Sequence, residues 1–260
     1  MIINQSDLKK IAEDCAEKIR SAVSEGNFFT EPFKHFHVDN FLPVELANLC
    51  IEAFPPLEDK IWEFSHIKDI EVKYRTKWES EFDIPDNLIY AIRILNSSLF
   101  MNEISKVMGI DKLVPDSYFT GGGLNVTKKN GLLDVHIDGN YHDATGLNRR
   151  LNALIYLNPD WEQSWGGELG FYDKEGKTCV KKIAPLFNRL VVFDTHDSSF
   201  HGIPGKINFP ENTSRKSILL YYYTKEKRPQ DQVTIDKPHS ALWKKLNFLD
   251  KNRKKTRNYY

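Results

Sequence analysis

Cysteine is scarce in this sequence. Only 3 of the 260 residues are cysteines, and Cys15, Cys50 and Cys179 are scattered along the chain. An odd, unclustered set excludes a disulfide framework and a cysteine-based zinc cluster. Because free thiols persist in a reducing compartment, we expect a cytoplasmic location.

Long apolar runs are also missing. No stretch of the sequence approaches the ~18 uninterrupted apolar residues that suggest a membrane-spanning helix. The first residues show no apolar run behind a basic start, which is the pattern of a signal peptide. We therefore expect neither a membrane span nor a membrane partner.

Neither sign of charge is in excess. Lysine plus arginine and aspartate plus glutamate both number 36, so we expect no general attraction to nucleic acid or anionic membranes. Basic residues do gather in residues 244–257, which we interpret as part of a solvated tail. A chain of this length can bury one sizeable core with flanking helices.

Helical patterns fill the first part of the chain. Apolar residues recur at helical spacing in three segments, the last of them in pieces, and Ser6 is the expected N-cap of the first. The expected helices are residues 6–25, 43–54 and about 85–108. Residues 60–81 mix polar and aromatic side chains and predict no element. We expect residues 1–116 to form a helical support for the core that follows.

From about residue 117 the pattern becomes strand-like. Short runs rich in β-branched and aromatic residues are bounded by Gly, Asn, Pro and Asp. The expected strands are residues 123–128, 133–137, 151–157, 168–172, 178–183, 189–194, 199–201 and 216–223. Many short strands with tight turns favour a sandwich or barrel. We therefore expect a mainly β protein with flanking helices, a core at 117–224 and a polar, basic C-terminal tail at 225–260.

The most informative pattern is His136-Ile-Asp138, followed far downstream by His201. Residues two apart in a strand point to the same face, so His136 and Asp138 could reach one metal ion together. His201 could complete the triangle from another strand. Two imidazoles and one carboxylate on one side of a metal leave its other side open, which suits Fe(II) chemistry with oxygen.

Two other histidines offer alternative ligands. His142 follows the first motif in a polar loop, and His196 lies in a turn just before His201. A solvent-facing loop position is the simpler interpretation of both. We prefer His201 because Ser-Phe-His-Gly is typical of a strand that ends at the site, and because its spacing to Arg215 is shorter.

Arg215 begins the last expected strand and alternates with Ser217 onto one face. A guanidinium with a neighbouring hydroxyl can hold the far carboxylate of a dicarboxylic co-substrate. Tyr156 could add its phenol to the same clamp, or it could be an ordinary core tyrosine. Together these patterns predict an iron- and 2-oxoglutarate-dependent oxygenase.

Further motifs surround these residues. A Tyr-Leu-Asn-x-x-Trp segment begins at Tyr156, a Gly-Gly pair follows at 166–167, and a Pro-x-x-Asn-Arg-Leu-x-x-Phe strand precedes His201. With the His-x-Asp pair, region 117–224 resembles the prolyl-hydroxylase-like branch of the iron/2-oxoglutarate dioxygenases. It is similar to the hypoxia-factor and ribosomal-protein prolyl hydroxylases. It is still more similar to stand-alone bacterial and viral oxygenases of that branch.

The resemblance implies a jelly-roll or cupin-like double-stranded β-helix with N-terminal helices packed on it. It implies Fe(II), 2-oxoglutarate and O2 as cofactor and co-substrates, with ascorbate as a reductant. Iron ligation would fall to His136, Asp138 and His201, and Arg215 would pair with the distal carboxylate of 2-oxoglutarate.

Two positions depart from the pattern of the resembled enzymes. Asn125 stands in the strand where those relatives often carry a tyrosine near the co-substrate, and Asn152 stands where they carry a threonine. We expect both amides, together with Tyr156 and Ser217, to contact 2-oxoglutarate.

The sequence leaves three functions open: hydroxylation of a prolyl residue in a protein, oxygenation of a small molecule, sugar or lipid, and metal binding by a non-catalytic β-barrel. The intact clamp argues against the third, because a barrel without turnover has no use for a dicarboxylate site. Loops 60–81 and 139–149 are expected to separate the first two, since a peptide needs an extended groove and a small molecule a closed pocket.

Overall fold

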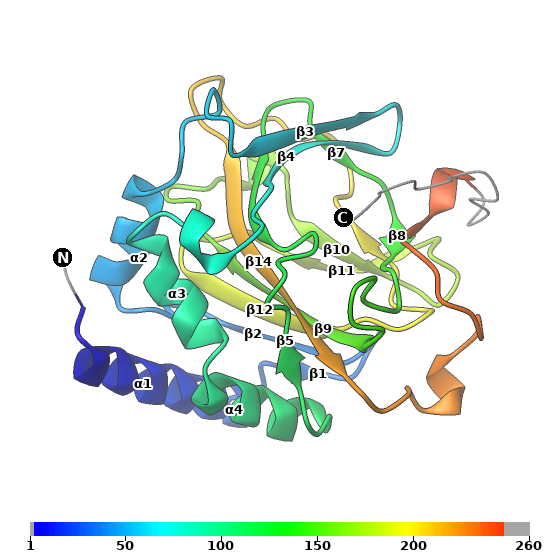
Figure 1. Cartoon of the computed structure of the whole chain (residues 1–260). Helices are drawn as coiled ribbons and strands as arrows, with labels where there is room; N and C mark the ends of the chain where they lie inside the picture. Colours follow the sequence, from blue (N-terminus) through cyan, green and yellow to red (C-terminus); the bar gives the residue numbers. More distant parts are fainter. Residues whose placement is uncertain (1–2, 247–260) are drawn as a thin grey trace.

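Two β-sheets face each other in the computed structural model, which describes residues 3–246 (Figure 1). The described helices pack on the outer face of the larger sheet, and their apolar side chains share one buried cluster with it. A second cluster fills the space between the two sheets. The expected mainly β fold with helices packed on a double sheet is confirmed.

The first seven strands belong to the larger sheet, and the later strands are divided between the two sheets. The larger sheet contains β1 (Phe28–Phe29), β2 (His35–Val38), β3 (Trp62–Ile67), β4 (Glu71–Thr76), β5 (Val114–Pro115), β6 (Gly123–Thr127), β7 (Leu132–Leu133), β9 (Asn148–Tyr156), β12 (Arg189–Asp194) and β14 (Arg215–Thr224). The smaller sheet contains β8 (His136–Ile137), β10 (Leu169–Tyr172), β11 (Cys179–Ile183), β13 (His201–Gly202) and β15 (Leu242–Trp243).

Strands distant in sequence become neighbours in both sheets. The larger sheet runs β1-β2-β12-β9-β14-β6-β4-β3, with β5 paired to β14 and β7 to β4, and the smaller runs β11-β10-β13-β8-β15. The strand pairs are antiparallel. This order places β8 beside β13, and β9 beside β14, which brings the expected site residues into range of one another.

The long strand β9 is buried on both faces. Leu151, Ala153 and Ile155 belong to the cluster shared with the helices, whereas Leu154 and Tyr156 belong to the cluster between the sheets. Alternation of this kind follows from the two-residue period of a strand. Strands β12 and β14 divide their side chains in the same way, so the inner face is the one that can carry chemistry.

Four helices cover the larger sheet in the described part of the chain. They are α1 (Gln5–Ser24), α2 (Val44–Glu52), α3 (Leu88–Leu95) and α4 (Ser98–Met108). Helix α1 begins one residue before the expected cap, because Asn4 rather than Ser6 accepts the hydrogen bond from Asp7 N. The expected third helix is two helices, since Ser97 accepts from Phe100 N and starts α4 anew.

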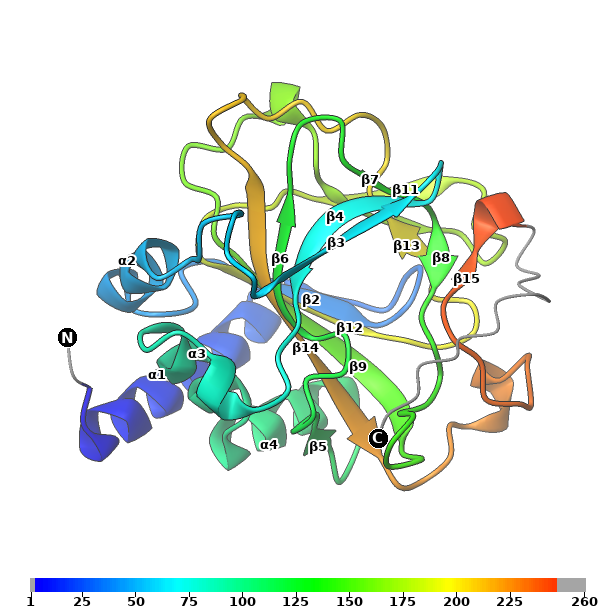
Figure 2. The same cartoon turned by 45° about the horizontal axis from the view of Figure 1, so that its top comes forward.

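Residues 60–81, which predicted no element, contain the hairpin β3–β4. Figure 2 shows it crossing the open end of the double sheet. Glu63 pairs with Arg75 at 2.7 Å, and Lys73 with Glu71 at 2.8 Å. Polar side chains alternate with aromatic or aliphatic ones along most of both strands, which is the two-residue pattern of a half-exposed strand, and the sequence analysis missed this signal.

The chain beyond β14 differs from the free polar tail that its composition suggested. Residues 225–246 run back along the molecule and add β15 to the smaller sheet. Backbone pairing and polar side-chain contacts, rather than an apolar run, hold this segment. Residues 247–260, with most of the basic run at 244–257, lie outside the described residues. Among the described helices, none combines the length and apolar character needed to cross a membrane.

Candidate metal centre

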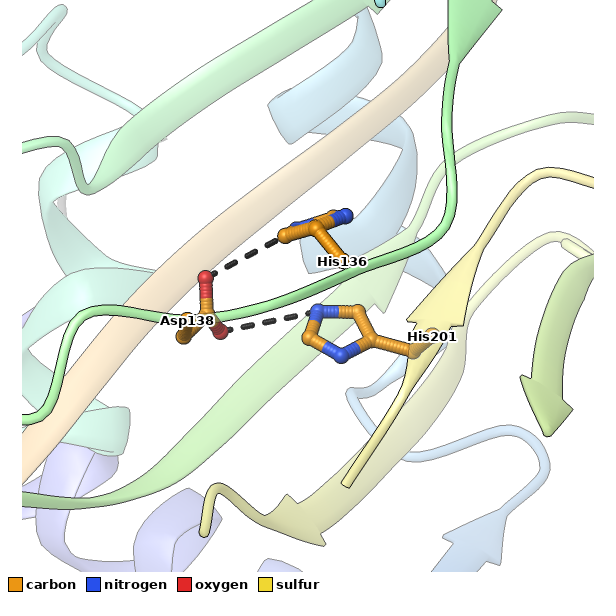
Figure 3. Close-up of side chains that lie close together, drawn as sticks. All are labelled: His136, Asp138 and His201. Atoms are coloured by element: carbon orange, nitrogen blue, oxygen red, sulfur yellow. Dashed lines mark ion pairs between the residues drawn. The ribbon is translucent and has the colours of Figure 1, made fainter. Parts of the chain in front are cut away.

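His136 begins β8 and His201 begins β13, and the two positions are directly opposite in the antiparallel pair. Asp138 follows the end of β8. Figure 3 shows its carboxylate reaching toward both imidazoles. Asp138 Oδ1 lies 3.7 Å from His136 Nε2, and its Oδ2 lies 3.5 Å from His201 Nε2. Ligand atoms of the three residues lie within 4.8 Å of one another, so all three can bind one ion.

Backbone carbonyls orient both imidazoles. His136 Nδ1 lies 2.9 Å from the carbonyl oxygen of Asp134, and His201 Nδ1 lies 2.9 Å from that of Ser199. A carbonyl can only accept, so Nδ1 carries the proton in each ring and Nε2 keeps its lone pair. Both lone pairs are therefore free for a metal, as in many histidine sites.

Burial sets the protonation states that metal ligation needs. It lowers the pKa of His136 to about 3, with nearby His201 acting in the same direction. Burial also lowers the pKa of His201. Burial alone would raise the pKa of Asp138, but Arg149 and the two histidines outweigh it and hold that pKa below its ordinary value. Two neutral imidazoles and an ionised carboxylate fit Fe(II).

Arg149, near the start of β9, is a functional residue that the sequence analysis missed. Its buried guanidinium lies 3.2 Å from Asp138 Oδ2 and stacks 3.4 Å from the centre of the Tyr221 ring. Burial alone would lower the pKa of Arg149, but Asp138 and two tyrosines raise it, so the cation persists. The available signal was a pair of arginines in an otherwise mostly apolar strand.

Asn152 has hydrogen-bond partners other than the expected co-substrate. Its Nδ2 donates to Asp138 Oδ2 at 2.8 Å, and its Oδ1 accepts from Arg149 Nη2 at 3.0 Å. Asn152 and Arg149 therefore hold the same carboxylate oxygen from two directions. Partners of this kind fix the geometry of a metal ligand. Its expected contact with 2-oxoglutarate stays a prediction, and Asn152 lines the cleft that contains the triad.

Arg215, Tyr156 and Ser217 meet on the inner face of the larger sheet, as expected for an anion clamp. Arg215 Nη2 donates to Tyr156 Oη at 3.1 Å, and its Nε donates to the Gly167 carbonyl at 2.7 Å. Neither bond uses Nη1. Ser217 pairs directly with Tyr156 across β14 and β9. Burial raises the pKa of Tyr156, which keeps its phenol protonated, and a fixed guanidinium of this kind suits a carboxylate.

The Gly-Gly turn before β10 supports the clamp. Gly167 adopts φ +84°, and a Cβ there would come 3.2 Å from Cδ of Arg215. Trp161 Nε1 donates to the Gly166 carbonyl at 2.9 Å, and the Trp165 ring packs on Phe209. The two tryptophans therefore pack at this turn and do not line the cleft described below.

Asn125 continues the clamp onto β6. Its position pairs with Ser217, so Asn125, Ser217 and Tyr156 form one row across three strands. Asn125 is 7% exposed, and its Nδ2 has no hydrogen-bond partner among the described residues. A buried donor without a partner usually awaits one that is absent from the structure. Its contact with 2-oxoglutarate stays a prediction, which this orphaned donor supports.

The two alternative histidines lie in other settings. His142 is buried rather than exposed. Its Nε2 contacts Asp116 Oδ1 at 3.0 Å, and its Nδ1 accepts a hydrogen bond from the backbone nitrogen of Ala144. This contact ties the loop after β8 to the loop before β6. His196 is half-buried, and its Nδ1 contacts Ser198. Among the described residues, neither joins the group that could hold a metal.

One cleft of about 1040 Å³ is lined by the triad and by Arg215 and Ser217 of the clamp. Hairpin β3–β4 lines it with alternating charges, including Glu63, Lys73 and Arg75. The segment Pro238–Ala241 and Trp243 line it from the C-terminal part of the chain. The cleft therefore has a polar wall on the hairpin and a second wall that the sequence analysis had assigned to a free tail.

Comparison with protein families finds a match to the 2OG-Fe(II) oxygenase superfamily over residues 122–223. Among curated proteins, prolyl 3-hydroxylase OGFOD1 of Mus musculus is 30% identical over 220 residues, which cover 80% of this chain and 38% of that protein. The chain thus spans well under half the length of this relative.

Solved structures share the fold. A prolyl hydroxylase from Trichoplax adhaerens, in complex with a hypoxia inducible factor peptide, has a TM-score of 0.61 at 18% identity and covers 85% of this chain and 94% of its own. A prolyl 4-hydroxylase structure from Phytophthora capsici has a TM-score of 0.53 at 16% identity, over 85% of this chain and 68% of its own. These likenesses confirm the expected double-stranded β-helix.

Proposed function

Because residues 122–223 of this chain form a domain of the 2OG-Fe(II) oxygenase superfamily, we propose that the protein is an iron- and 2-oxoglutarate-dependent dioxygenase that hydroxylates an unactivated C–H bond. Succinate and carbon dioxide would be the co-products. The observation that carries this proposal is the placement of a two-histidine, one-carboxylate group and a buried arginine clamp in one cleft.

Each group in the cleft has a separate task. His136, Asp138 and His201 hold the metal, and bound Fe(II) supplies the activation of O2 that is coupled to oxidative decarboxylation of 2-oxoglutarate. Arg215 and Tyr156 hold the far carboxylate of the co-substrate. The 6% exposure of Arg215 strengthens this ion pair, because little water competes for it.

We propose a prolyl residue of a polypeptide as the target. The curated relative is a prolyl 3-hydroxylase, and the fold is that of prolyl hydroxylases. The cleft between the hairpin and the C-terminal segment gives an extended chain two walls to contact. Protein and metabolite extracts incubated with the enzyme, searched by mass spectrometry for a 2-oxoglutarate-dependent gain of one oxygen, test this. A gain confined to small molecules, sugars or lipids would replace the prolyl assignment.

We further propose that ascorbate acts as a reductant and that the protein works in the cytoplasm, which its free cysteines support. The equal numbers of acidic and basic residues support a partner other than nucleic acid or membrane.

The clamp is tested by its affinity for 2-oxoglutarate. Arg215→Ala should weaken binding by about 2–5 kcal/mol, because it leaves a buried carboxylate without its cation. Lys216→Ala is the matched control, since Lys216 points to the other face of β14 and its ammonium lies over Phe54. Calorimetric titration of the metal-loaded protein measures both. Equal affinities of the Arg215→Ala variant and the wild type would remove Arg215 from the clamp.

The metal triad is tested by turnover. His136→Ala should abolish iron binding and the formation of succinate from 2-oxoglutarate, because two ligands remain in a site built for three. His66 on hairpin β3–β4 is exposed, so the control variant His66→Ala should keep both iron binding and succinate formation. Iron content by elemental analysis and succinate by mass spectrometry are the measurements. A wild-type protein that binds metal but forms no succinate would favour the non-catalytic β-barrel.

A further inference from the structure

The chain after β14 returns to the metal centre. We call residues 225–246 the C-terminal strap. Figure 2 shows it passing, from orange to red, from the end of β14 to β15 beside β8. The superfamily match ends at residue 223, so the strap is a feature of this chain beyond that match.

Two groups of buried contacts fix the strap. Arg228, 8% exposed, donates from Nη1 to Asp194 Oδ1 at 2.9 Å. Asp197 accepts from the backbone nitrogen of Thr234 at 2.7 Å. Asp194 and Asp197 lie on the segment of chain that leads from β12 to His201. The strap is therefore tied to the part of the fold that carries the distal histidine.

The strap ends as β15, which completes the smaller sheet. Trp243 pairs with His136, and Leu242 pairs with Ile137. On its other side β8 pairs with β13. Without β15, the strand that carries His136 would be an open edge, with its backbone groups exposed to water or to another chain.

Trp243 covers a face of the His136 ring. The two ring centres lie 4.4 Å apart and the ring planes differ by 27°, which is a stacked arrangement. Trp243 is 6% exposed and lines the cleft. Its neighbour Leu242 packs instead against the apolar cluster that contains Val135 and Phe200. Trp243 of β15 thus lies against the metal centre, whereas Leu242 packs in the core.

We propose that Trp243 is a positioning residue of the metal centre. Its indole holds the His136 imidazole in the orientation that ligation needs and keeps water from that side of the ion. An imidazole already held in one orientation loses less freedom on binding a metal, so affinity rises. This inference rests on the proposed function only through the metal-binding role of His136, and it does not depend on the identity of the substrate.

Metal affinity tests the proposal without turnover. The probe is Co(II), a stand-in for Fe(II) that is stable in air, titrated calorimetrically into the full-length protein. Trp243→Ala should bind Co(II) about tenfold more weakly than the wild type, as is usual for lost outer partners of a ligand. Trp243→Phe should restore most of the affinity, because a phenyl ring can stack on His136. Leu242→Ala should bind like the wild type.

Tryptophan fluorescence gives a second readout, which tests whether the ion binds beside Trp243. Paramagnetic Co(II) quenches an indole that lies close to it, so binding should quench the wild type. Trp243→Phe should lose most of this quenching while still binding the ion. Trp165→Phe, which removes a tryptophan outside the cleft, should keep it.

The outcomes separate the inference from the proposed function. Wild-type affinity in Trp243→Ala, or equal weakening in Leu242→Ala, would overturn the assignment to Trp243 and leave the oxygenase proposal standing. Unchanged quenching in Trp243→Phe would place the bound ion away from His136 and overturn it as well. No Co(II) binding by the wild type would overturn both.

Discussion

At the scale of single residues, the Asp138 carboxylate depends on the side chains that surround it. As a metal ligand it must stay ionised inside a buried site, where an isolated carboxylate is costly. Arg149 and Asn152 meet that requirement by holding its Oδ2 at 3.2 Å and 2.8 Å. The arginine also stacks on Tyr221, which limits its movement. The ligand therefore depends on side chains that touch no metal themselves.

Replacing Arg149 should weaken the metal centre. Arg149→Met keeps much of the side-chain volume but removes the cation, so metal affinity should fall by roughly 10–100-fold. Arg150→Met is the matched control, because Arg150 is also buried but is not among the residues that line the cleft. Calorimetric titration with Co(II) measures both, and thermal unfolding monitors folding. Similar losses in the two variants would mean that burial of any arginine in β9, and not the contact with Asp138, is what matters.

Residue types and their order predicted the chemistry of the site well. His136, Asp138 and His201 lie together, and Arg215, Tyr156 and Ser217 meet as a clamp. Arg149 was missed because the expected strand began at residue 151, which left Arg149 in the preceding loop, whereas β9 begins at Asn148. Asn152 was assigned to the co-substrate from the resemblance, whereas its contact with Asp138, 14 residues away in sequence, came only from the fold.

At the scale of elements, the turn before β10 shapes the clamp as much as the strands do. The Gly166–Gly167 pair brings a backbone carbonyl to Arg215 Nε at 2.7 Å. Both glycines have positive φ, a conformation that favours glycine. A side chain at Gly167 would press on Arg215 and on the ring of Phe209, 3.0 Å away. The turn therefore requires glycine for space as well as for backbone conformation.

Gly167→Ala should loosen the grip on 2-oxoglutarate. The added methyl group displaces Arg215, so we expect weaker co-substrate binding with metal affinity preserved. Gly205→Ala is a matched control, because Gly205 has nearly the same φ, +82°, but nothing within 4 Å of its added Cβ. Calorimetry with 2-oxoglutarate distinguishes them. If both variants lose affinity equally, backbone strain and not contact with Arg215 explains the effect.

Some elements were predictable and others were not, for a physical reason. Strands β9, β12 and β14 are buried on both faces, so near-continuous apolar runs mark them in the sequence. Strand β15, in contrast, is only two residues long. Such strands form because a neighbour offers backbone partners, and local sequence carries little of that information.

At the scale of the whole molecule, the space between the sheets stays apolar around a buried histidine. His35 on β2 is fully buried, and its ring lies 5.0 Å from that of Phe29 and 4.8 Å from that of Phe171. Burial lowers its pKa from 6.5 to about 4, against the smaller opposing effect of a hydrogen bond to Phe33. The packing of both sheets thus favours a neutral imidazole.

This pKa predicts how stability depends on pH. Because the pKa of His35 is lower in the folded state, the unfolded chain takes up the proton first as the pH falls. The contribution of His35 to the free energy of unfolding should be constant above about pH 6.5 and decline toward pH 4, by on the order of 1 kcal/mol per pH unit.

Urea unfolding of the metal-free protein at pH 7, 6 and 5 measures this decline. His35→Phe should flatten the pH dependence relative to the wild type, whatever its effect at pH 7. The control His66→Ala, at an exposed position, should parallel the wild type. Parallel curves for His35→Phe and the wild type would show that His35 does not titrate in this range.

The amino-acid sequence alone predicted the chemistry of the site and which of its residues share one face of a strand. Residue types supplied two imidazoles, a carboxylate and a guanidinium, and the two-residue spacing of His136 with Asp138 and of Arg215 with Ser217 predicted that each pair shares a face. Tertiary structure decided the rest: which oxygen Arg149 and Asn152 hold, how hairpin β3–β4 lines the cleft, and that Trp243 lies on His136. These contacts join residues far apart in sequence, and only the folded chain brings them within reach.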